Sequence, residues 1–433
     1  MSPTFRALHV RNYRLYALGG VVSNTGTWMQ RIAQDWLVLQ LHGGSEAQAA
    51  TALGITTGLQ FLPILLFSAY AGLVADRISK RRMLQLTQAF MGLTAGVLAV
   101  LALTGVAQPW MVYLIAFVFG TGTAFDAPAR QSFVSEMVGP EDLTNAVGLN
   151  SASFNLARLV GPALSGLLIA AFGSGVRATG LVIALNAVSY LTVILALRAM
   201  RGAELTPTAP VSRGRGQLRE GLAYVRGRRD IMLILAVIFF VGTFGMNFQI
   251  TSALMATQVY GKGAGEYGLL GTTLAIGSLS GALIGARRTT RPRMRLVVGA
   301  ALAFGVLEVA AGLMPTYLAF AVLTPALGLS TLLMMNAANT YVQLGTQPAM
   351  RGRVLALYLM IFQGGTPVGA PIIGWVGGTL GARWTMIGGG AIAVVGVLLA
   401  VAVFSGGPRL RYRRGRRSRT GVEVEAEEAA LAA

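Results

Sequence analysis

Apolar runs of about 20 residues recur along nearly the whole chain, and each is long enough to cross a lipid bilayer as a helix. Of the 433 residues, 54% are hydrophobic and only 12% are charged, about half the charged fraction of a soluble protein. The pattern predicts an all-α integral membrane protein with twelve transmembrane helices. We place them at about 14–40, 49–75, 83–104, 109–137, 145–172, 178–198, 230–256, 266–286, 295–313, 316–343, 353–376 and 384–404.

Basic residues are divided unequally between the two sides of the predicted membrane. Most of the 35 Lys and Arg residues lie in the amino terminus, in the loops that follow even-numbered spans or in the carboxyl tail. The exceptions are Arg177, Lys262 and Arg383 on the opposite side and Arg31, Arg130 and Arg158 inside spans. The positive-inside rule therefore predicts a multi-pass protein of the cell membrane with both termini in the cytoplasm. This distribution makes nucleic acid a poor partner for the net charge of +19.

The two sets of six spans share one plan. Residues 161–166 (GPALSG) match residues 369–374 (GAPIIG), and the same offset of 208 positions pairs Gly120 with Gly328. A duplicated six-helix unit predicts a substrate site near the membrane midplane, between the halves. We expect a first bundle at 1–198, a cytoplasmic loop at 199–229, a second bundle at 230–406 and a disordered cytoplasmic tail at 407–433.

The loop at residues 72–82 combines a glycine, an acid and a basic cluster, including Gly72, Asp76, Arg77 and Arg81. This pattern resembles the loop 2–3 signature of the major facilitator superfamily. The basic residues would hold the loop at the cytoplasmic face, and Asp76 and Arg77 could meet neighbouring helix ends and keep an inward gate shut. An ordinary positive-inside loop is the alternative.

The resemblance gives Glu136, at the end of the fourth span, a role in the same gate. It implies a charge relay between Glu136 and Arg77 or Arg81. Loss of that relay should favour the outward-facing state.

Span five carries a face of small residues that is similar to the antiporter motif of drug exporters. Its residues are Gly148, Ala157, Gly161, Pro162, Ser165 and Gly166. Ala157 and Ser165 replace two glycines of that motif. In the family this face closes against the other half on the outer side, which hinders leak during exchange. A generic packing face is the alternative.

Four further runs look like the branch that contains enterobactin exporters and macrolide efflux proteins. They are residues 27–30, 33–38, 126–131 and 155–162. The resemblance implies the major facilitator fold, with two pseudo-symmetric six-helix bundles. The branch says little about the cargo. Our leading hypothesis is a proton-driven antiporter that exports a hydrophobic or amphipathic small molecule such as a drug, siderophore or secondary metabolite.

Charged residues inside the spans are candidates for proton coupling, because such groups are costly in a membrane. Asp126 can pair with Arg130, one helical turn later, and with Arg158, which we expect at similar depth on the antiparallel fifth span. Such a carboxylate would bind a proton only after a conformational change separates it from the arginines. A static ion pair is the equally weighted alternative.

Asp35 lies four residues after Arg31 on span one. It is either a proton or substrate contact in the cavity or half of an intrahelical ion pair, and we favour the pair slightly. Glu308 on span nine is expected to pair structurally or to extend toward the interface.

The cavity is otherwise expected to be apolar and aromatic, which suits bulky hydrophobic cargo. Plain helix packing is the alternative for any single residue. Our candidates for contact with the cargo are Trp28, Gln30, Phe125, Phe244, Asn247, Gln249, Asn336 and Asn339.

Other classes of protein fit less well. The chain has no cysteine and no phosphate-binding Gly-x4-Gly-Lys-Ser/Thr loop, so we expect no cofactor, no thiolate metal site and no ATP hydrolysis. An enzyme lacks support, since histidines, cysteines and clustered carboxylates are missing from the spans. A non-transporting membrane sensor would need an appended soluble domain or long ordered loops, which we do not expect here. Uptake by a symporter or facilitator is the alternative transport hypothesis. The partners expected are a small molecule, protons and lipid, with the protein a bacterial monomer.

Overall fold

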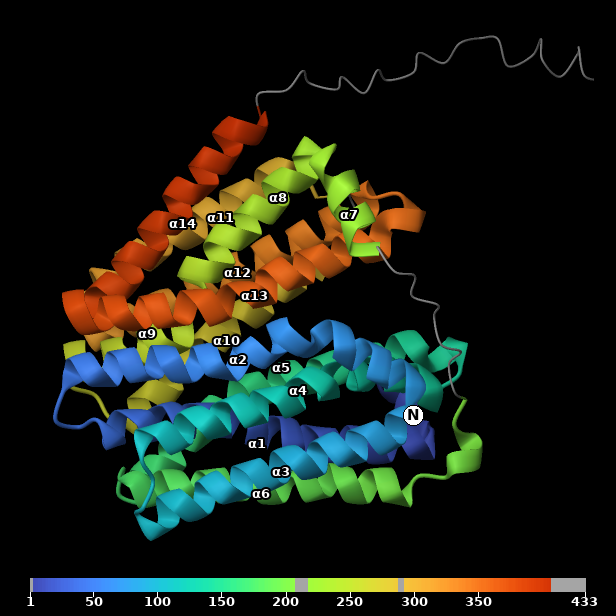
Figure 1. Ribbon diagram of the computed structural model, residues 1–433, viewed down its shortest axis with the longest axis horizontal. Coiled ribbons are helices and arrows are strands. Elements are labelled where there is room, and N and C mark those ends of the chain that lie inside the picture. The colour runs from blue at the N-terminus through green and yellow to red at the C-terminus, as the bar shows by residue number, and fades with distance from the viewer. Residues whose placement is uncertain (1–2, 207–216, 287–291, 406–433) are drawn as a thin grey trace, which may run out of the picture.

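The structure, a computed structural model, describes residues 3–206, 217–286 and 292–405, except for a few side chains within those ranges. These residues are nearly all helical and contain no strand. They form two bundles that meet along one end and separate toward the other (Figure 1).

The first bundle contains six long helices, each followed by a short turn. A 3-10 turn, η1 (Pro3–His9), precedes them. The helices are α1 (Arg11–Leu41), α2 (Glu46–Arg77), α3 (Lys80–Thr104), α4 (Pro109–Met137), α5 (Pro140–Ala171) and α6 (Val176–Ala199).

The second bundle opens with an interrupted span. α8 (Arg229–Phe240) continues through a π-helical turn, η3 (Val241–Gly245), into α9 (Phe248–Leu254) and a second π-helical turn, η4 (Met255–Val259). The remaining spans are α10 (Ala264–Ala286), α11 (Met294–Gly312), α12 (Tyr317–Gly345), α13 (Pro348–Leu380) and α14 (Ala382–Ser405). Between the bundles lie a short turn, η2 (Gly202–Glu204), and α7 (Gln217–Arg226), which packs on α13.

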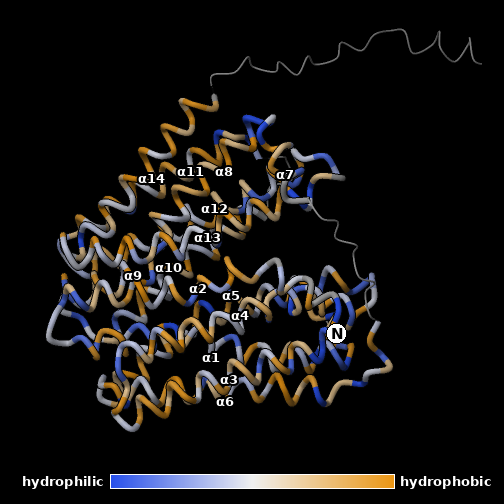
Figure 2. Tube along the Cα trace, in the orientation of Figure 1, coloured by the Kyte–Doolittle hydropathy of each residue, from blue (hydrophilic) through white to orange (hydrophobic). Residues whose placement is uncertain are grey.

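Within residues 3–206, 217–286 and 292–405, twelve helical stretches have the length of membrane spans. In the described part of the chain, 11 of them are also apolar enough to cross a bilayer. The twelfth is α1, whose 31 residues lie alongside α5 and α6 but include several charged and polar side chains. Figure 2 shows hydrophobic residues along most of each helix. The predicted span order is confirmed, whereas the π-helical turns and α7 were not predicted.

Helix ends follow local sequence signals. Ser45 precedes α2, and its hydroxyl accepts a hydrogen bond from the Gln48 amide. Pro109 and Pro140 occupy the first positions of α4 and α5, where a missing amide hydrogen costs nothing. α3 ends at Gly105, whose φ of 77° is a left-handed conformation that glycine adopts without strain.

The internal repeat is visible in how the helices pack. Gly120 of α4 lies against the carbonyl of Gln60 in α2, and Gly328 of α12 lies in the same way against Leu274 in α10. A side-chain carbon at either glycine would collide with that backbone. The two six-helix units therefore repeat the close α2–α4 contact as α10–α12.

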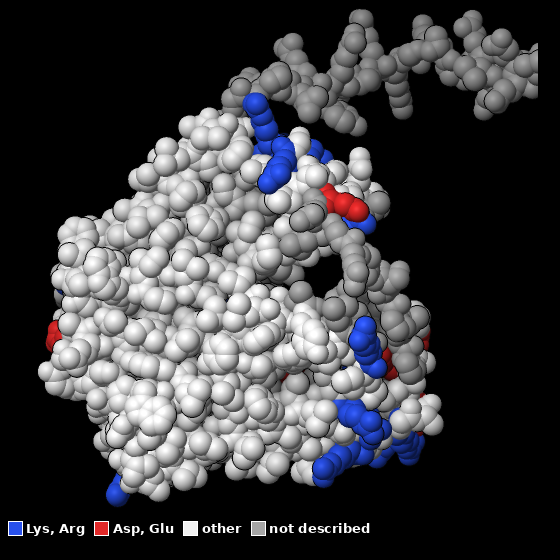
Figure 3. Space-filling model, viewed as in Figure 1, with Lys and Arg blue, Asp and Glu red and all other residues white. Residues whose placement is uncertain are grey.

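We call the two ends of the molecule the arginine-rich end and the closed end. The arginine-rich end carries the amino terminus and the segments at 77–82, 198–201 and 226–229, and Figure 3 shows Lys and Arg gathered there beside an opening between the bundles. The closed end carries the turns at 42–45, 105–108, 172–175 and 260–263. There α2 packs on α13 and α5 packs on α10.

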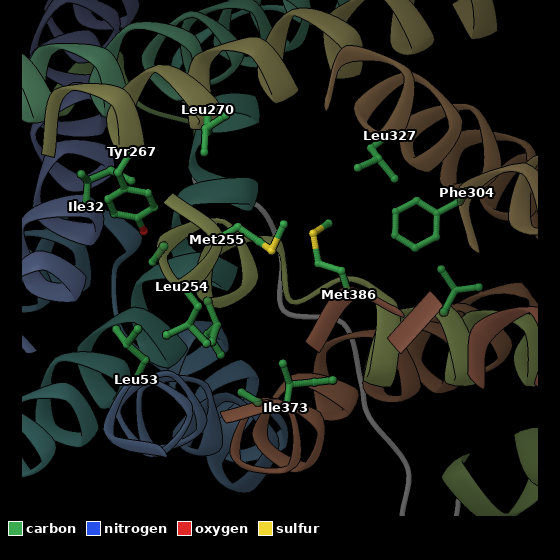
Figure 4. Packing of buried hydrophobic residues seen from close by; sticks show 14 of the residues in the cluster. Ile32, Leu53, Leu254, Met255, Tyr267, Leu270, Phe304, Leu327, Ile373 and Met386 are labelled. Atoms are coloured by element: carbon green, nitrogen blue, oxygen red, sulfur yellow. The ribbon is translucent and has the colours of Figure 1, made fainter. Parts of the chain in front are cut away.

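At the closed end, glycines bring helix backbones of the two bundles into direct contact. Gly54 of α2 lies against Gly374 of α13, and Gly166 of α5 lies against Gly268 of α10. Buried apolar side chains from both bundles, among them Ile32, Leu53 and Leu254, continue this contact inward (Figure 4). Among the described residues, these contacts hold the two halves together toward the closed end.

Candidate functional site

Two cavities lie next to each other and share the side chain of Arg31. The first, of about 200 Å³, lies between the bundles, and residues of both line it, including Trp28, Arg158, Asn247 and Gln249. The second, of about 620 Å³, lies within the first bundle among α1, α4 and α5. Its lining includes Asp126 and Arg130.

Among the described residues, the partners of Asp126 all belong to its own bundle. One carboxylate oxygen, Oδ1, accepts hydrogen bonds from the Thr87 hydroxyl at 2.7 Å and from the Gln88 amide at 2.8 Å. The other, Oδ2, accepts one from Arg130 Nε at 2.9 Å, so the predicted ion pair with Arg130 is present. Three donors thus surround this buried carboxylate.

The expected pairing of Asp126 with Arg158 is wrong. Arg158 instead lies over the ring of Trp28, with its guanidinium carbon 5.6 Å from the ring centroid. Equal depth on antiparallel helices places two residues at one height, but it does not turn their side chains toward each other.

Asp35 connects the two bundles. Its Oδ2 accepts a hydrogen bond of 2.6 Å from Gln249 in α9 and one of 2.7 Å from the Tyr267 hydroxyl in α10. The side chain is buried, and among the described residues it has no ion pair within 4 Å. The expected pair with Arg31 is therefore replaced by contacts across the interface. Tyr267 was missed in the sequence because nothing near it marks a partner 232 positions away.

Three of the eight residues proposed for the cargo cavity line the first cavity, namely Trp28, Asn247 and Gln249. Gln30 instead accepts a short hydrogen bond from Asn186 inside the first bundle. Two positions along a helix separate Gln30 from Trp28, which turns the two side chains to different faces.

The other four proposed residues pack elsewhere. Phe125 stacks near Phe67 and Tyr70 of α2, and Phe244 lies near Phe239 and α14. Asn339 accepts a hydrogen bond from Gln343, and Asn336 lies beside Gly285. None of these four is among the residues that line the two cavities.

The small-residue face of span five contacts both its own bundle and the other one. Gly161 lies against Trp28, and the Ser165 hydroxyl donates a hydrogen bond of 2.9 Å to the carbonyl of Met29. Pro162 and Gly166 lie against α10 of the other bundle. At the other end of the motif, Ala157 is buried, whereas Gly148 is exposed with open space beside it.

The gating residues are arranged differently from the prediction. Glu136 binds Lys80 Nζ at 2.5 Å, not Arg77 or Arg81, since Lys80 begins α3 directly beside the end of α4. Arg81 donates to the carbonyls of Leu197 and Arg198 in α6, and Arg77 is exposed.

Gly72, which was also predicted to belong to the gate, is buried in α2. The Asp76 side chain lies outside the described residues, as do residues 207–216 of the central loop and the tail at 407–433.

Glu308 does not extend to the membrane surface as expected. Its side chain is buried in α11 beside Gly245 and Gly389, and its Oε2 has no hydrogen-bond partner among the described residues. It lies outside both cavities.

Comparison with known proteins agrees with this architecture. Residues 2–406 match the family described as transmembrane secretion effector. The chain is 26% identical to the multidrug efflux pump Tap of Mycolicibacterium fortuitum over 92% of this chain and 96% of that protein. It is 24% identical to the enterobactin exporter EntS of Citrobacter koseri over 87% of each.

A shorter match and a solved structure complete the comparison. The staphyloferrin A transporter of Staphylococcus aureus is 32% identical over 148 residues, which are 34% of this chain and only 36% of that protein. A bacterial homologue of the human lysosomal transporter Spinster, solved in an inward-facing and unoccupied conformation, superposes with a TM-score of 0.71 at 15% identity. That superposition covers 94% of this chain and 98% of the homologue, and it shows a shared fold.

Proposed function

This chain belongs to the transmembrane secretion effector family of the major facilitator superfamily, and we propose that it exports a hydrophobic or amphipathic small molecule from a bacterial cell in exchange for protons. It is a membrane transporter, not an enzyme. Relatives named as exporters of drugs and a siderophore support the outward direction.

The observation that carries the proposal is the contrast between the two ends of the interface. Pro162 and Gly166 of the antiporter-like face pack tightly on α10 at the closed end. At the arginine-rich end an opening separates the bundles (Figure 3). This is the arrangement expected of one state in an alternating-access cycle, in which rocking of the two bundles would open the closed end and close the other.

The positive-inside rule supports placing the arginine-rich end in the cytoplasm. In that orientation the cavities receive cargo from inside the cell. The state described here is then inward-facing, and the turns of the closed end face outward.

Proton coupling rests on Asp126, which lines the second cavity, and on Asp35, whose two donors line the first. Asp35 is the stronger candidate because its two donors, Gln249 and Tyr267, belong to the other bundle. Separation of the bundles would break both bonds, so gain or loss of a proton at Asp35 changes the free energy of closure. The bonds of Asp126 need not break in that motion.

Transport into inside-out membrane vesicles tests direction and coupling together. With the vesicle lumen acidified, wild-type protein should accumulate at least one compound from a screened panel of hydrophobic and amphipathic molecules that includes anions, neutral compounds and cations. Addition of that compound should also dissipate the pH gradient. Accumulation in right-side-out vesicles instead would mean uptake. If Asp126→Asn leaves coupling unchanged while Asp35→Asn abolishes it, Asp126 is removed as the proton site.

A further inference from the structure

Two arginine side chains contact the same tryptophan ring in the first cavity. The guanidinium carbon of Arg31 lies 4.6 Å from the centroid of the Trp28 ring, and that of Arg158 lies 5.6 Å from it. Arg31 also lies 5.5 Å from the centroid of Phe61. Aromatic faces hold a cation by attraction to the ring, but they do not neutralise its charge.

Neither arginine has an acidic partner. Among the described residues, neither forms an ion pair within 4 Å or donates a hydrogen bond. The two nearby acids are already bound, Asp35 by Gln249 and Tyr267 and Asp126 by Arg130. Two positive charges therefore face one cavity, and Asp35, which attracts Arg31 from one helical turn away, directs its hydrogen bonds to other groups.

Their depth makes this imbalance costly. Arg31 lies ten residues before the end of α1 at Leu41, about 15 Å along the helix axis. Arg158 lies thirteen residues before the end of α5 at Ala171, about 20 Å along that axis. Charges at such depth are normally paired or in contact with a ligand.

We propose that Arg31 and Arg158 bind an anionic group of the cargo, a carboxylate or a phosphate, while the rest of the cargo lies against the apolar wall of the first cavity. The inference rests on the proposed function, since it specifies the class of molecule transported. Guanidinium groups present parallel N–H donors that match the two oxygens of a carboxylate. Ile32, Met246 and Phe248 supply the apolar wall, and Asn247 and Gln249 add polar contacts.

The proposal narrows the expected cargo from hydrophobic and amphipathic compounds in general to amphipathic anions. A neutral isostere would leave both guanidinium groups unpaired, so the site discriminates against it. A cation would be repelled.

Binding without any gradient tests this inference separately from export. Full-length protein in phosphatidylcholine nanodiscs is dialysed against 2-naphthoate or against its neutral isostere, 2-naphthamide. We expect wild-type protein to bind naphthoate at least about tenfold more tightly, the effect of losing charge-assisted hydrogen bonds. Arg31→Gln and Arg158→Gln should each remove most of that preference, whereas Arg31→Lys and Arg158→Lys should retain part of it.

The matched control is Arg177→Gln, because Arg177 is exposed at the closed end and lines neither cavity. It should bind both probes as wild type does. Equal binding of the two probes by folded wild-type protein, or no binding of naphthoate, overturns the proposal. So do Gln variants that keep the preference.

A lipid head group could supply the same anionic chemistry, and a second arm separates the two sources. Nanodiscs that contain phosphatidylglycerol should bind naphthoate as phosphatidylcholine nanodiscs do. Competition by phosphatidylglycerol would overturn the assignment of the site to cargo. Failure of transport in vesicles with intact naphthoate binding would count against the proposed export and leave this site standing.

Discussion

Asp35 and Asp126 are both buried acids in the first bundle, yet their surroundings differ in one respect. All donors to Asp126 come from α3 and α4 of the same bundle. Both donors to Asp35 come from α9 and α10 of the other bundle. Asp126 therefore links helices of one bundle, whereas Asp35 links the two bundles to each other.

The two carboxylates should therefore affect different properties. Asp126 should affect the stability of the fold, and Asp35 should affect the balance between arrangements of the two bundles. Removing a contact within one bundle weakens folding but acts alike on every arrangement of the two bundles. Removing a contact between bundles changes the balance between arrangements, because the contact exists in only one of them. The predictions below test this separation with two readouts, the melting temperature and a distance across the closed end.

The largest expected effect comes from Arg130→Met. It leaves the carboxylate of Asp126 buried without its cation, which costs about 3–5 kcal/mol of folding free energy. Thermal unfolding of the detergent-solubilised protein should show a clear fall in melting temperature. The double variant with Asp126→Asn should recover part of the loss. A single variant as stable as wild type would show that Asp126 does not depend on this pair.

Asp35→Asn should have the next largest effect, but on conformation. Two hydrogen bonds to a charged group weaken at once, so the closed end should open by about tenfold to a hundredfold in population. Spin labels at Arg177→Cys and Leu313→Cys report the distance, and the chain has no other cysteine. Asp126→Asn is the control and should leave the distance distribution unchanged. The comparison fails if both variants shift the distance equally.

Tyr267→Phe removes one of the two donors to Asp35 and leaves the ring in place. The closed end should open in the same direction but by less, about tenfold, as expected for one hydrogen bond to a charged group. The same spin-label pair measures it. A shift as large as that of Asp35→Asn would mean that Gln249 contributes nothing.

Thr87→Val should have the smallest effect. It removes a neutral hydroxyl that donates to Asp126 while Gln88 and Arg130 remain, which costs about 1 kcal/mol of stability. The melting temperature should fall slightly, and the distance across the closed end should stay as in wild type. An altered distance would place Asp126 among the groups that control closure.

Much of the fold could be predicted because it depends on features that are local in sequence. Runs of apolar residues set the spans, and the repeated glycines at 120 and 328 mark the same close contact in each half. The ion pair of Asp126 with Arg130 was predictable for the same reason, since residues four apart face each other on a helix.

The rest depends on the rotation of helices and on contacts between distant segments. Sequence position gave the height of Arg158 but not the side of α5 on which it lies, so its contact with Trp28 was not foreseen. Tyr267 and Asp35 meet only because the two bundles meet. The π-helical turns of the seventh span shift which residues face the cavity. No pattern in the sequence predicted these turns.

The glycine contacts at the closed end have a consequence for how such a chain can change over generations. Where Gly54 lies on Gly374 and Gly166 on Gly268, almost no side chain takes part, so nothing there depends on the identity of the compound carried. The walls around Trp28 can therefore acquire new residues while the glycine contacts of the closed end stay as they are. A transporter with this architecture can therefore evolve to carry new compounds through substitutions at a few positions of the cavity wall.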